Sequence, residues 1–320
     1  MNEIINSTLW TQILAELGER LKKPSTELPN VQWLSEPRLK RLLVDIRKAA
    51  KAPPTLSGVK LLRMLVDSKL AQMLKLDDCP SSKKPHVVYY LELGAMPSIS
   101  PVELLQTTQV SFDRSVICYF TALEYHELTT QETPHHHIAS LKSTSGQIVS
   151  EPLPSSPGND NTQTGQSDRA PSLGTLLFYY QGVPYYVTYR DPKWVPGIQT
   201  VLLSPTCQVR MTTLEQTLLD TLHKPWSCGG PSVVFEAWER GVPLLDDTRL
   251  FEYLKKIGRA DLTRRVGYML ENNNFSPVDS GLCKLLSDAK AKAKEGLLPI
   301  IPLLPDVPSK TLNETWGLYT

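Results

Sequence analysis

Two adjacent prolines, Pro53 and Pro54, constrain the fold of this chain most, because proline interrupts a helix and these two separate two segments of helical spacing. Before them, residues 37–50 carry one apolar stripe, made by Leu39, Leu42, Leu43, Ile46 and Ala50. After them, residues 55–69 form a second helix, in which Ser57 is a suitable N-cap. In this second helix we expect the inward residues to be Val59, Leu62, Leu65 and Val66.

Two strand patterns follow the second helix. Residues 71–76 and 86–93 are predicted to be strands, and the segment 77–84 between them is polar and rich in turn-forming residues. Helix, helix and hairpin in this order predict a winged helix-turn-helix, with the hairpin as the wing.

The same region is strongly basic. Residues 36–76 hold ten basic and three acidic side chains, a net charge of +7, whereas the whole chain has a net charge of +1. Charge alone favours a solvated helix face, but charge together with the helix–helix–hairpin order favours double-stranded DNA as a partner. The candidate DNA-binding residues are Arg38, Arg41, Arg47, Lys48, Lys60, Arg63, Lys69, Lys75, Lys83 and Lys84.

The second helix is the proposed recognition helix, since Lys60 and Arg63 are three residues apart and share its outer face with Asp67. The helix at 38–50 and an N-terminal helix at 7–22 remain alternatives. In each case the neighbouring cations are expected to neutralise phosphates.

The whole chain is predicted to be an α+β protein of 320 residues, with about two or three domains. A winged helix-turn-helix precedes a small mixed α/β middle domain and a C-terminal helical domain. The expected segments are an N-terminal helical extension (1–35), the winged helix-turn-helix (36–95), the mixed α/β domain (96–211), the helical domain (212–295) and a Pro-rich tail (296–320) that either packs or extends freely. Residues 143–173, poor in large apolar side chains, are expected to be a disordered insertion.

Sequence patterns of metal and catalytic sites are weak. His135, His136 and His137 are consecutive on a predicted strand, so their side chains alternate between its faces, and we expect a surface strand edge rather than a chelate. The five cysteines are far apart and form no C-x-x-C pair. No nucleophile motif is present, and Gly229-Gly230 lacks the Lys-Ser or Lys-Thr of a phosphate loop, so a turn is expected there. We therefore expect a protein without catalytic residues, cofactor or metal.

A second set of charged residues lies in the predicted helical domain. Asp220, Arg264 and Arg265 form either salt bridges within this domain or, with Arg259, a second basic patch for DNA or a partner.

The chain is expected to be cytoplasmic and not attached to a membrane. Residues 1–23 lack the apolar core of a signal peptide, and no run of about 18 apolar residues occurs. An odd number of scattered cysteines fits a reducing compartment.

Four segments in order resemble the AbiE antitoxin family. LLRMLVDSKLAQMLKL (61–76) is similar to its recognition helix and wing, and CYFTALEYHELTTQ (118–131) to its strand–helix–His segment, with Glu127 where glycine is usual. MTTLEQTLLDTLHKPWSCGG (211–230) and RRVGYMLE (264–271) resemble the start and end of its C-terminal domain. The resemblance covers 36–275 and leaves the N-terminal helix, the insertion and the tail outside the pattern.

This resemblance implies a transcriptional repressor of a type IV toxin–antitoxin system in phage defence. Such a protein binds inverted repeats in its own promoter, self-associates in some cases, and represses an operon that also encodes a nucleotidyltransferase-like toxin. The alternative is a non-catalytic interaction subunit of a multi-protein phage-defence complex, in which the winged helix docks on protein.

Overall fold

The computed structural model describes residues 7–78, 86–92, 95–109, 111–142 and 173–320. Residues 143–172 of the expected insertion and 79–85 of the expected wing lie outside the described residues. By its contacts the chain divides into two units. Unit 1 comprises Met1–Ile117, Leu176–Tyr185 and Thr200–Arg210, and unit 2 comprises Cys118–Thr175, Tyr186–Gln199 and Met211–Thr320. The segment 96–211, expected to be one middle domain, contributes residues to both units.

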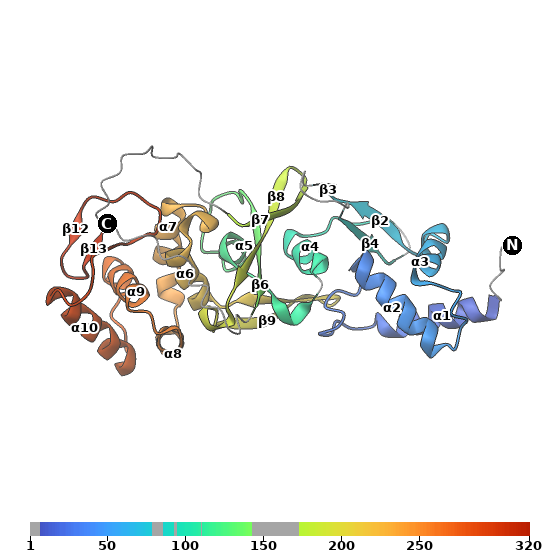
Figure 1. Cartoon of the computed structure of the whole chain (residues 1–320), viewed down its shortest axis with the longest axis horizontal. Helices are drawn as coiled ribbons and strands as arrows, with labels where there is room; N and C mark the ends of the chain where they lie inside the picture. Colours follow the sequence, from blue (N-terminus) through green and yellow to red (C-terminus); the bar gives the residue numbers. More distant parts are fainter. Residues whose placement is uncertain (1–6, 79–85, 93–94, 110, 143–172) are drawn as a thin grey trace, which may run out of the picture. The chain divides into compact units, whose positions relative to one another are not determined.

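Unit 1 begins with three helices and a small antiparallel sheet. The helices are α1 (Ser7–Arg20), α2 (Glu36–Ala49) and α3 (Gly58–Asp67). The strands β1 (Trp33–Ser35), β2 (Gln72–Lys75) and β4 (Val87–Tyr90) lie in the order β1-β4-β2, shown in blue in Figure 1. Tyr90 lies opposite Trp33 on one side and Gln72 on the other. The predicted pair of strands after the second helix is confirmed.

The N-terminal helix α1 packs into the same core as α2 and α3. Ile13 and Leu17 of α1 are buried in one cluster with Leu39, Leu43 and the other apolar residues of α2 and α3. The segment 1–35, expected to be an extension, therefore shares its apolar core with the following helices, and its strand β1 pairs with β4.

The buried face of α3 differs from the expectation at two positions. Gly58, Leu61, Leu62 and Leu65 are its buried residues, which is the i, i+3, i+4, i+7 spacing of one helix face. The expectation for Leu62 and Leu65 is confirmed, but that for Val59 and Val66 was wrong, because these two residues are exposed at the edge of the buried face. Ser57 caps the helix as predicted, accepting a hydrogen bond from the Lys60 N–H.

Helix α3 begins at a close approach to α2. A Cβ atom on Gly58 would lie 2.7 Å from the Lys40 carbonyl oxygen and 3.0 Å from Cγ2 of Val44. Only glycine fits this contact without movement of the backbone, so Gly58 sets the separation of the two helices.

A larger sheet of seven strands has the order β3-β7-β8-β6-β5-β10-β9. Its strands are β3 (Asp77–Asp78), β5 (Ser115–Ile117), β6 (His136–Leu141), β7 (Thr175–Tyr180), β8 (Val183–Arg190), β9 (Ile198–Ser204) and β10 (Cys207–Thr212). The predicted β7–β8 turn at Gln181-Gly182 is confirmed, and both residues have positive φ, as a two-residue type I′ turn requires. Helix α4 (Pro101–Thr108), with a capping box at Ser100, lies between β4 and β5 in sequence.

Unit 2 is mainly helical, as predicted. Its helices are α5 (Tyr119–Tyr125), α6 (Leu214–His223), α7 (Pro231–Gly241), α8 (Asp247–Ile257), α9 (Ala260–Asn272) and α10 (Ser280–Lys294), with short 3-10 turns η2 (Pro192–Trp194), η3 (Pro225–Cys228) and η4 (Val242–Leu244). Residues 215–222 of α6 are all buried, so this helix is surrounded by the others. Gly229 and Gly230 have φ of 92° and 95° and form the turn between η3 and α7, which confirms the expected turn.

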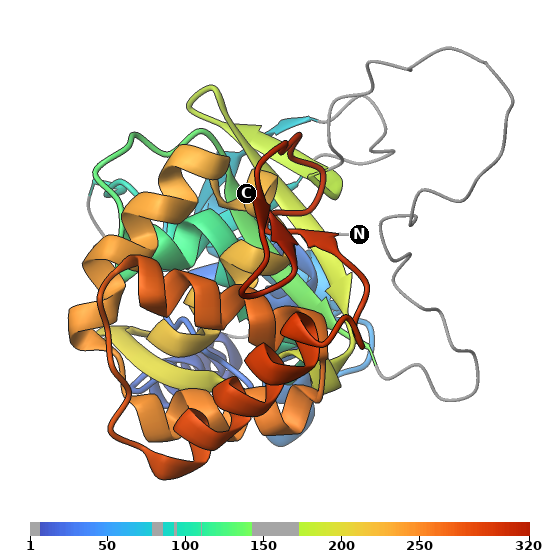
Figure 2. The same cartoon turned by 90° about the vertical axis from the view of Figure 1, so that its left-hand side faces the viewer.

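The Pro-rich tail packs onto unit 2. Its strands β11 (Ile301–Pro302), β12 (Leu312–Asn313) and β13 (Leu318–Tyr319) form a small sheet of order β11-β13-β12, drawn in dark red in Figure 2. Trp316 and Leu318 are buried in the main apolar cluster of this unit. The ring of Trp316 lies so close to Gly267 of α9 that a Cβ there would be 2.2 Å from it.

The position where the resembled family usually has glycine is conformationally special in this chain. Glu127, directly after α5, has a φ of 57°, in the left-handed region that glycine adopts most easily. Its carbonyl accepts a hydrogen bond of 2.9 Å from Nε of Arg240 on α7, which holds this turn against the helix.

Candidate nucleic-acid interface

Helix α3 presents a basic and partly apolar face outward. Lys60 and Arg63 are exposed, as predicted, and within the described part of the chain neither makes an ion pair. Val59 is 59% exposed and Val66 is 37% exposed. At 100° per residue, Arg63 lies at the centre of this face, with the two valines on one side and Lys60 on the other. We call these four residues the α3 face.

Four of the other candidate DNA-binding residues are also exposed. They are Arg41, Lys48, Lys69 and Lys75. Lys48 has a long ion pair of 3.9 Å with Asp45, and both partners are exposed, so it remains available to a phosphate. Lys83 and Lys84 lie outside the described residues.

Two of the candidate residues hold the fold instead. Arg38 is largely buried and donates a 3.1 Å hydrogen bond from Nη2 to the Gln109 carbonyl. Burial, together with the charge of Arg41, lowers the pKa of Arg38 to about 10. Arg47 donates from Nη1 to the carbonyls of Pro54 and Leu56, at 3.0 and 3.3 Å, and so fastens the α2–α3 connection. The expectation that Arg38 and Arg47 bind phosphates is therefore corrected.

The proposed second basic patch does not form. Arg264 and Arg265 are only 1% and 4% exposed. Nη1 of Arg264 donates to the carbonyls of Pro299 (2.9 Å) and Gly317 (3.2 Å), and Arg265 donates to those of Leu222 and Pro302. The tail covers these two side chains and supplies carbonyl acceptors for their N–H groups. Arg259, which is partly exposed, makes a two-pronged ion pair with Asp261.

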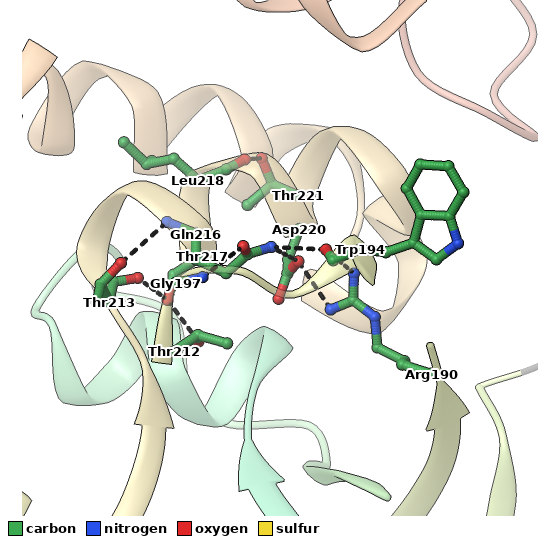
Figure 3. Close-up of polar contacts among 10 residues, drawn as sticks. All are labelled: Arg190, Trp194, Gly197, Thr212, Thr213, Gln216, Thr217, Leu218, Asp220 and Thr221. Carbon is green, nitrogen blue, oxygen red and sulfur yellow. Dashed lines mark hydrogen bonds and ion pairs between the residues drawn. The ribbon is translucent and has the colours of Figure 1, made fainter. Parts of the chain in front are cut away.

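The acid–base set expected around Asp220 has a different partner. Nη1 of Arg190, at the end of β8, donates to Oδ1 of Asp220 at 2.8 Å, and Nε2 of Gln216 donates to the same oxygen at 2.8 Å (Figure 3). Although burial disfavours the charge of Arg190, the Asp220 carboxylate raises its pKa above the usual value. The Trp194 carbonyl accepts from both Arg190 and Gln216. The expected set of Asp220 with Arg264 and Arg265 was therefore wrong: Asp220 does form a salt bridge, but its partner is Arg190, from outside the segment 212–295.

This buried network fastens β8 and η2 to α6. Thr213 caps α6 and accepts from the Gln216 N–H, and the Thr217 hydroxyl bonds to the Thr213 carbonyl at 2.8 Å (Figure 3). The neighbouring thiols of Cys118 and Cys228 have raised pKa values because they are fully buried. Each contact satisfies a polar group that folding has removed from water, and the network is a structural element.

A pocket of about 360 Å³, counting its part open to solvent, lies beside this network in unit 2. Its walls include Trp194, Ile257 and Leu262, together with the paired Arg259 and Asp261. Three arginines and two aspartates line this pocket, and each arginine lies within 4.0 Å of an aspartate carboxylate, which distinguishes the pocket from the α3 face.

The three consecutive histidines are buried. His135, His136 and His137 are 5%, 3% and 0% exposed, so the expectation of a surface strand edge was wrong. Strand β6 lies between β8 and β5 in the sheet, where no edge is free. Burial lowers the pKa of His136 to about 4 and of His137 to about 3. Within the described residues, no group of three His, Cys, Asp or Glu side chains is placed to hold a metal ion.

Sequence reasoning missed two residues. Arg190 stands at the end of a strand pattern, and only the fold brings it to Asp220, thirty positions away. The outward position of Val59 was available from the sequence, because the stripe Gly58, Leu61, Leu62, Leu65 fits helical spacing better than one that includes Val59.

Comparison with known proteins gives a fold and no family. No family model matches this chain, and no curated protein matches it. Among solved structures, the chain is similar to the crystal structure of the RV2827C protein from Mycobacterium tuberculosis, with a TM-score of 0.51 and 11% sequence identity over 97% of this chain and 90% of that chain. At this identity the likeness is one of α+β fold. In the part of the chain that the structure describes, no helix has the length and apolarity needed to cross a membrane.

Proposed function

We propose that this protein is a sequence-specific DNA-binding regulator. The order α1-β1-α2-α3-β2-β4, with the sheet order β1-β4-β2, is the order of elements in a winged helix-turn-helix. In this proposal α3 is the recognition helix, and the antiparallel strands β2 and β4 form the wing. The connection between these two strands contains β3, which pairs with β7 of the larger sheet. Strand β2 ends at the exposed Lys75, next to this connection.

The observation that carries the proposal is the α3 face. Its two cations are exposed and have no carboxylate partner among the described residues, whereas Arg190 and Arg259 in unit 2 have one. An α-helix fits the major groove of B-DNA, where arginine and lysine donate to the O6 and N7 atoms of guanine. Arg41, Lys48, Lys69 and Lys75 supply the phosphate contacts that fix the helix in the groove.

The regulatory context comes from the resemblance to AbiE antitoxins. In this proposal the protein binds inverted repeats upstream of its own gene and blocks transcription of an operon that encodes a nucleotidyltransferase-like toxin in phage defence. It acts in the cytoplasm, with self-association at paired half-sites, and carries out no chemical step. A nucleotidyltransferase gene next to its own would support this context.

The test is binding of the full-length protein to a duplex from immediately upstream of its own gene, at two salt concentrations. The paired change Lys60→Ala with Arg63→Ala should weaken binding by about 5- to 100-fold if one residue reads a guanine. The free energy of unfolding, followed by thermal melts, should change by no more than about 0.5 kcal/mol per site, because both residues are exposed. The matched control is Lys256→Ala with Lys284→Ala, which removes the same charge from exposed positions of unit 2. Equal affinity of both double variants would contradict the proposal.

A specific observation favours a second candidate, the interaction subunit. Val59, Val66 and Met73 are large apolar side chains exposed on α3 and the following strand β2, and such groups also occur in protein-docking surfaces. In that case the protein would co-purify with neighbouring gene products and would not bind its upstream duplex even at low salt.

A further inference from the structure

Val59 does not pack in the apolar core, so core packing does not explain why a β-branched apolar residue occupies this position. It is the second residue of α3, its side chain is 59% exposed, and the apolar cluster of unit 1 contains neither Val59 nor Val66. Solvated helix positions favour residues such as lysine, glutamate or alanine over valine. The exposed Val59, between the capping Ser57 and the two cations, is therefore available for contact with a partner.

Val59 and Val66 lie at different positions along α3. In helix-turn-helix proteins, residues in the first turns of the recognition helix reach the base edges. Val59 lies there, next to Lys60 and one turn before Arg63, whereas Val66 lies in the last turn. The cations favour a polyanion as the occupant of this surface, because Lys60 and Arg63 make no ion pair within the described residues, even with Asp67 exposed on the same helix.

We propose that Val59 is a specificity-determining residue that reads the C5-methyl group of a thymine in the major groove, beside a guanine bound by Arg63 or Lys60. The thymine methyl is the apolar group that this groove displays, and aliphatic side chains recognise it by contact. The proposal rests on the proposed function and adds the base that α3 selects. The methyl group of 5-methylcytosine would offer the same contact. In an unmethylated synthetic duplex, thymine is the base that carries a C5-methyl group.

The test replaces each thymine of the upstream duplex by uracil, which removes one methyl group and leaves the base-pairing edge unchanged. For the wild-type protein, one or two positions per half-site should weaken binding about fourfold, the effect of one buried methyl group. Val59→Ala should bind the thymine duplex more weakly by a similar factor and should no longer distinguish uracil from thymine at these positions. Val278→Ala, which removes the same two methyl groups from a 90% exposed position of unit 2, is the matched control and should behave as wild type.

Each outcome decides the inference. Loss of the uracil effect in Val59→Ala alone supports it. Uracil positions that remain sensitive in Val59→Ala, or wild-type binding that no uracil affects, overturn it and leave DNA binding intact. Failure of the wild-type protein to bind the duplex at low salt overturns the proposed function and this inference together. Thermal melts of both variants should match wild type, since both valines are exposed.

Discussion

Two pairs of basic residues in this protein lie on helices and have opposite environments. Lys60 and Arg63 on α3 are exposed and without ion pairs in the described chain, whereas Arg264 and Arg265 on α9 are buried and donate to backbone carbonyls. Both pairs lie on helices with strong apolar stripes. The difference is the C-terminal tail, which brings carbonyl acceptors to α9, whereas no described segment does so for Lys60 and Arg63 of α3. A cluster of cations is thus a binding surface only where the fold leaves its donors unused.

The largest effect should come from the buried ion pair. Asp220→Ala leaves the Arg190 guanidinium buried without its carboxylate, and the free energy of unfolding should fall by about 3–5 kcal/mol. Chemical denaturation measures it. Asp288→Ala removes an exposed carboxylate from α10 and should stay within about 0.5 kcal/mol of wild type. A loss under about 1 kcal/mol for Asp220→Ala would show that the network does not hold β8 to α6.

The two sides of α3 should separate stability from binding. Leu62 is buried, so Leu62→Ala should cost about 2–5 kcal/mol of unfolding free energy and weaken DNA binding only by unfolding the protein. Val66→Ala, one turn further along at a position that is 37% exposed, should cost no more than about 0.5 kcal/mol. Denaturation of the two variants side by side provides the comparison, and similar losses would mean that the helix is rotated from the orientation described.

Acid should destabilise the protein through its buried histidines. The pKa of His136 is about 4 and that of His137 about 3, both lowered by burial, while an unfolded histidine titrates near about 6.5. Below pH 6.5 the unfolded chain therefore binds protons that the folded chain does not, and stability falls as the pH falls. Between pH 6.5 and 5 each of these histidines should remove about 1.5 kcal/mol. His137→Gln should reduce this slope in denaturation curves, and an unchanged slope would count against a neutral His137.

The smallest effects should distinguish the two kinds of arginine on α2. Arg47→Ala removes donors to the carbonyls of Pro54 and Leu56 and should cost about 1 kcal/mol of stability. Arg41→Ala should leave the free energy of unfolding within about 0.5 kcal/mol of wild type. It should also make the slope of log affinity against log salt concentration shallower by about 0.9, the effect of one lost phosphate contact. Thermal melts and binding affinities at several salt concentrations, measured for both variants, test these expectations. If Arg41→Ala lowered stability and Arg47→Ala changed the salt dependence, the two roles would be exchanged.

The sequence by itself determined the local elements. Proline positions, apolar spacing and the Gln181-Gly182 turn predicted α2, α3, the β2–β4 pair, the β7–β8 hairpin and the helices of unit 2, because these signals act between residues close in the chain. They also indicated that Lys60 and Arg63 face outward.

The tertiary structure decided what surrounds each charged group. Arg190 meets Asp220, the tail covers Arg264 and Arg265, and β6 buries three histidines, and none of these environments follows from neighbouring residues. The physical reason is that a charged side chain in the interior is stable only when polar groups from distant segments replace water around it. Those partners are brought together when the elements pack, so the sequence pattern shows the charge and the fold shows whether it is free.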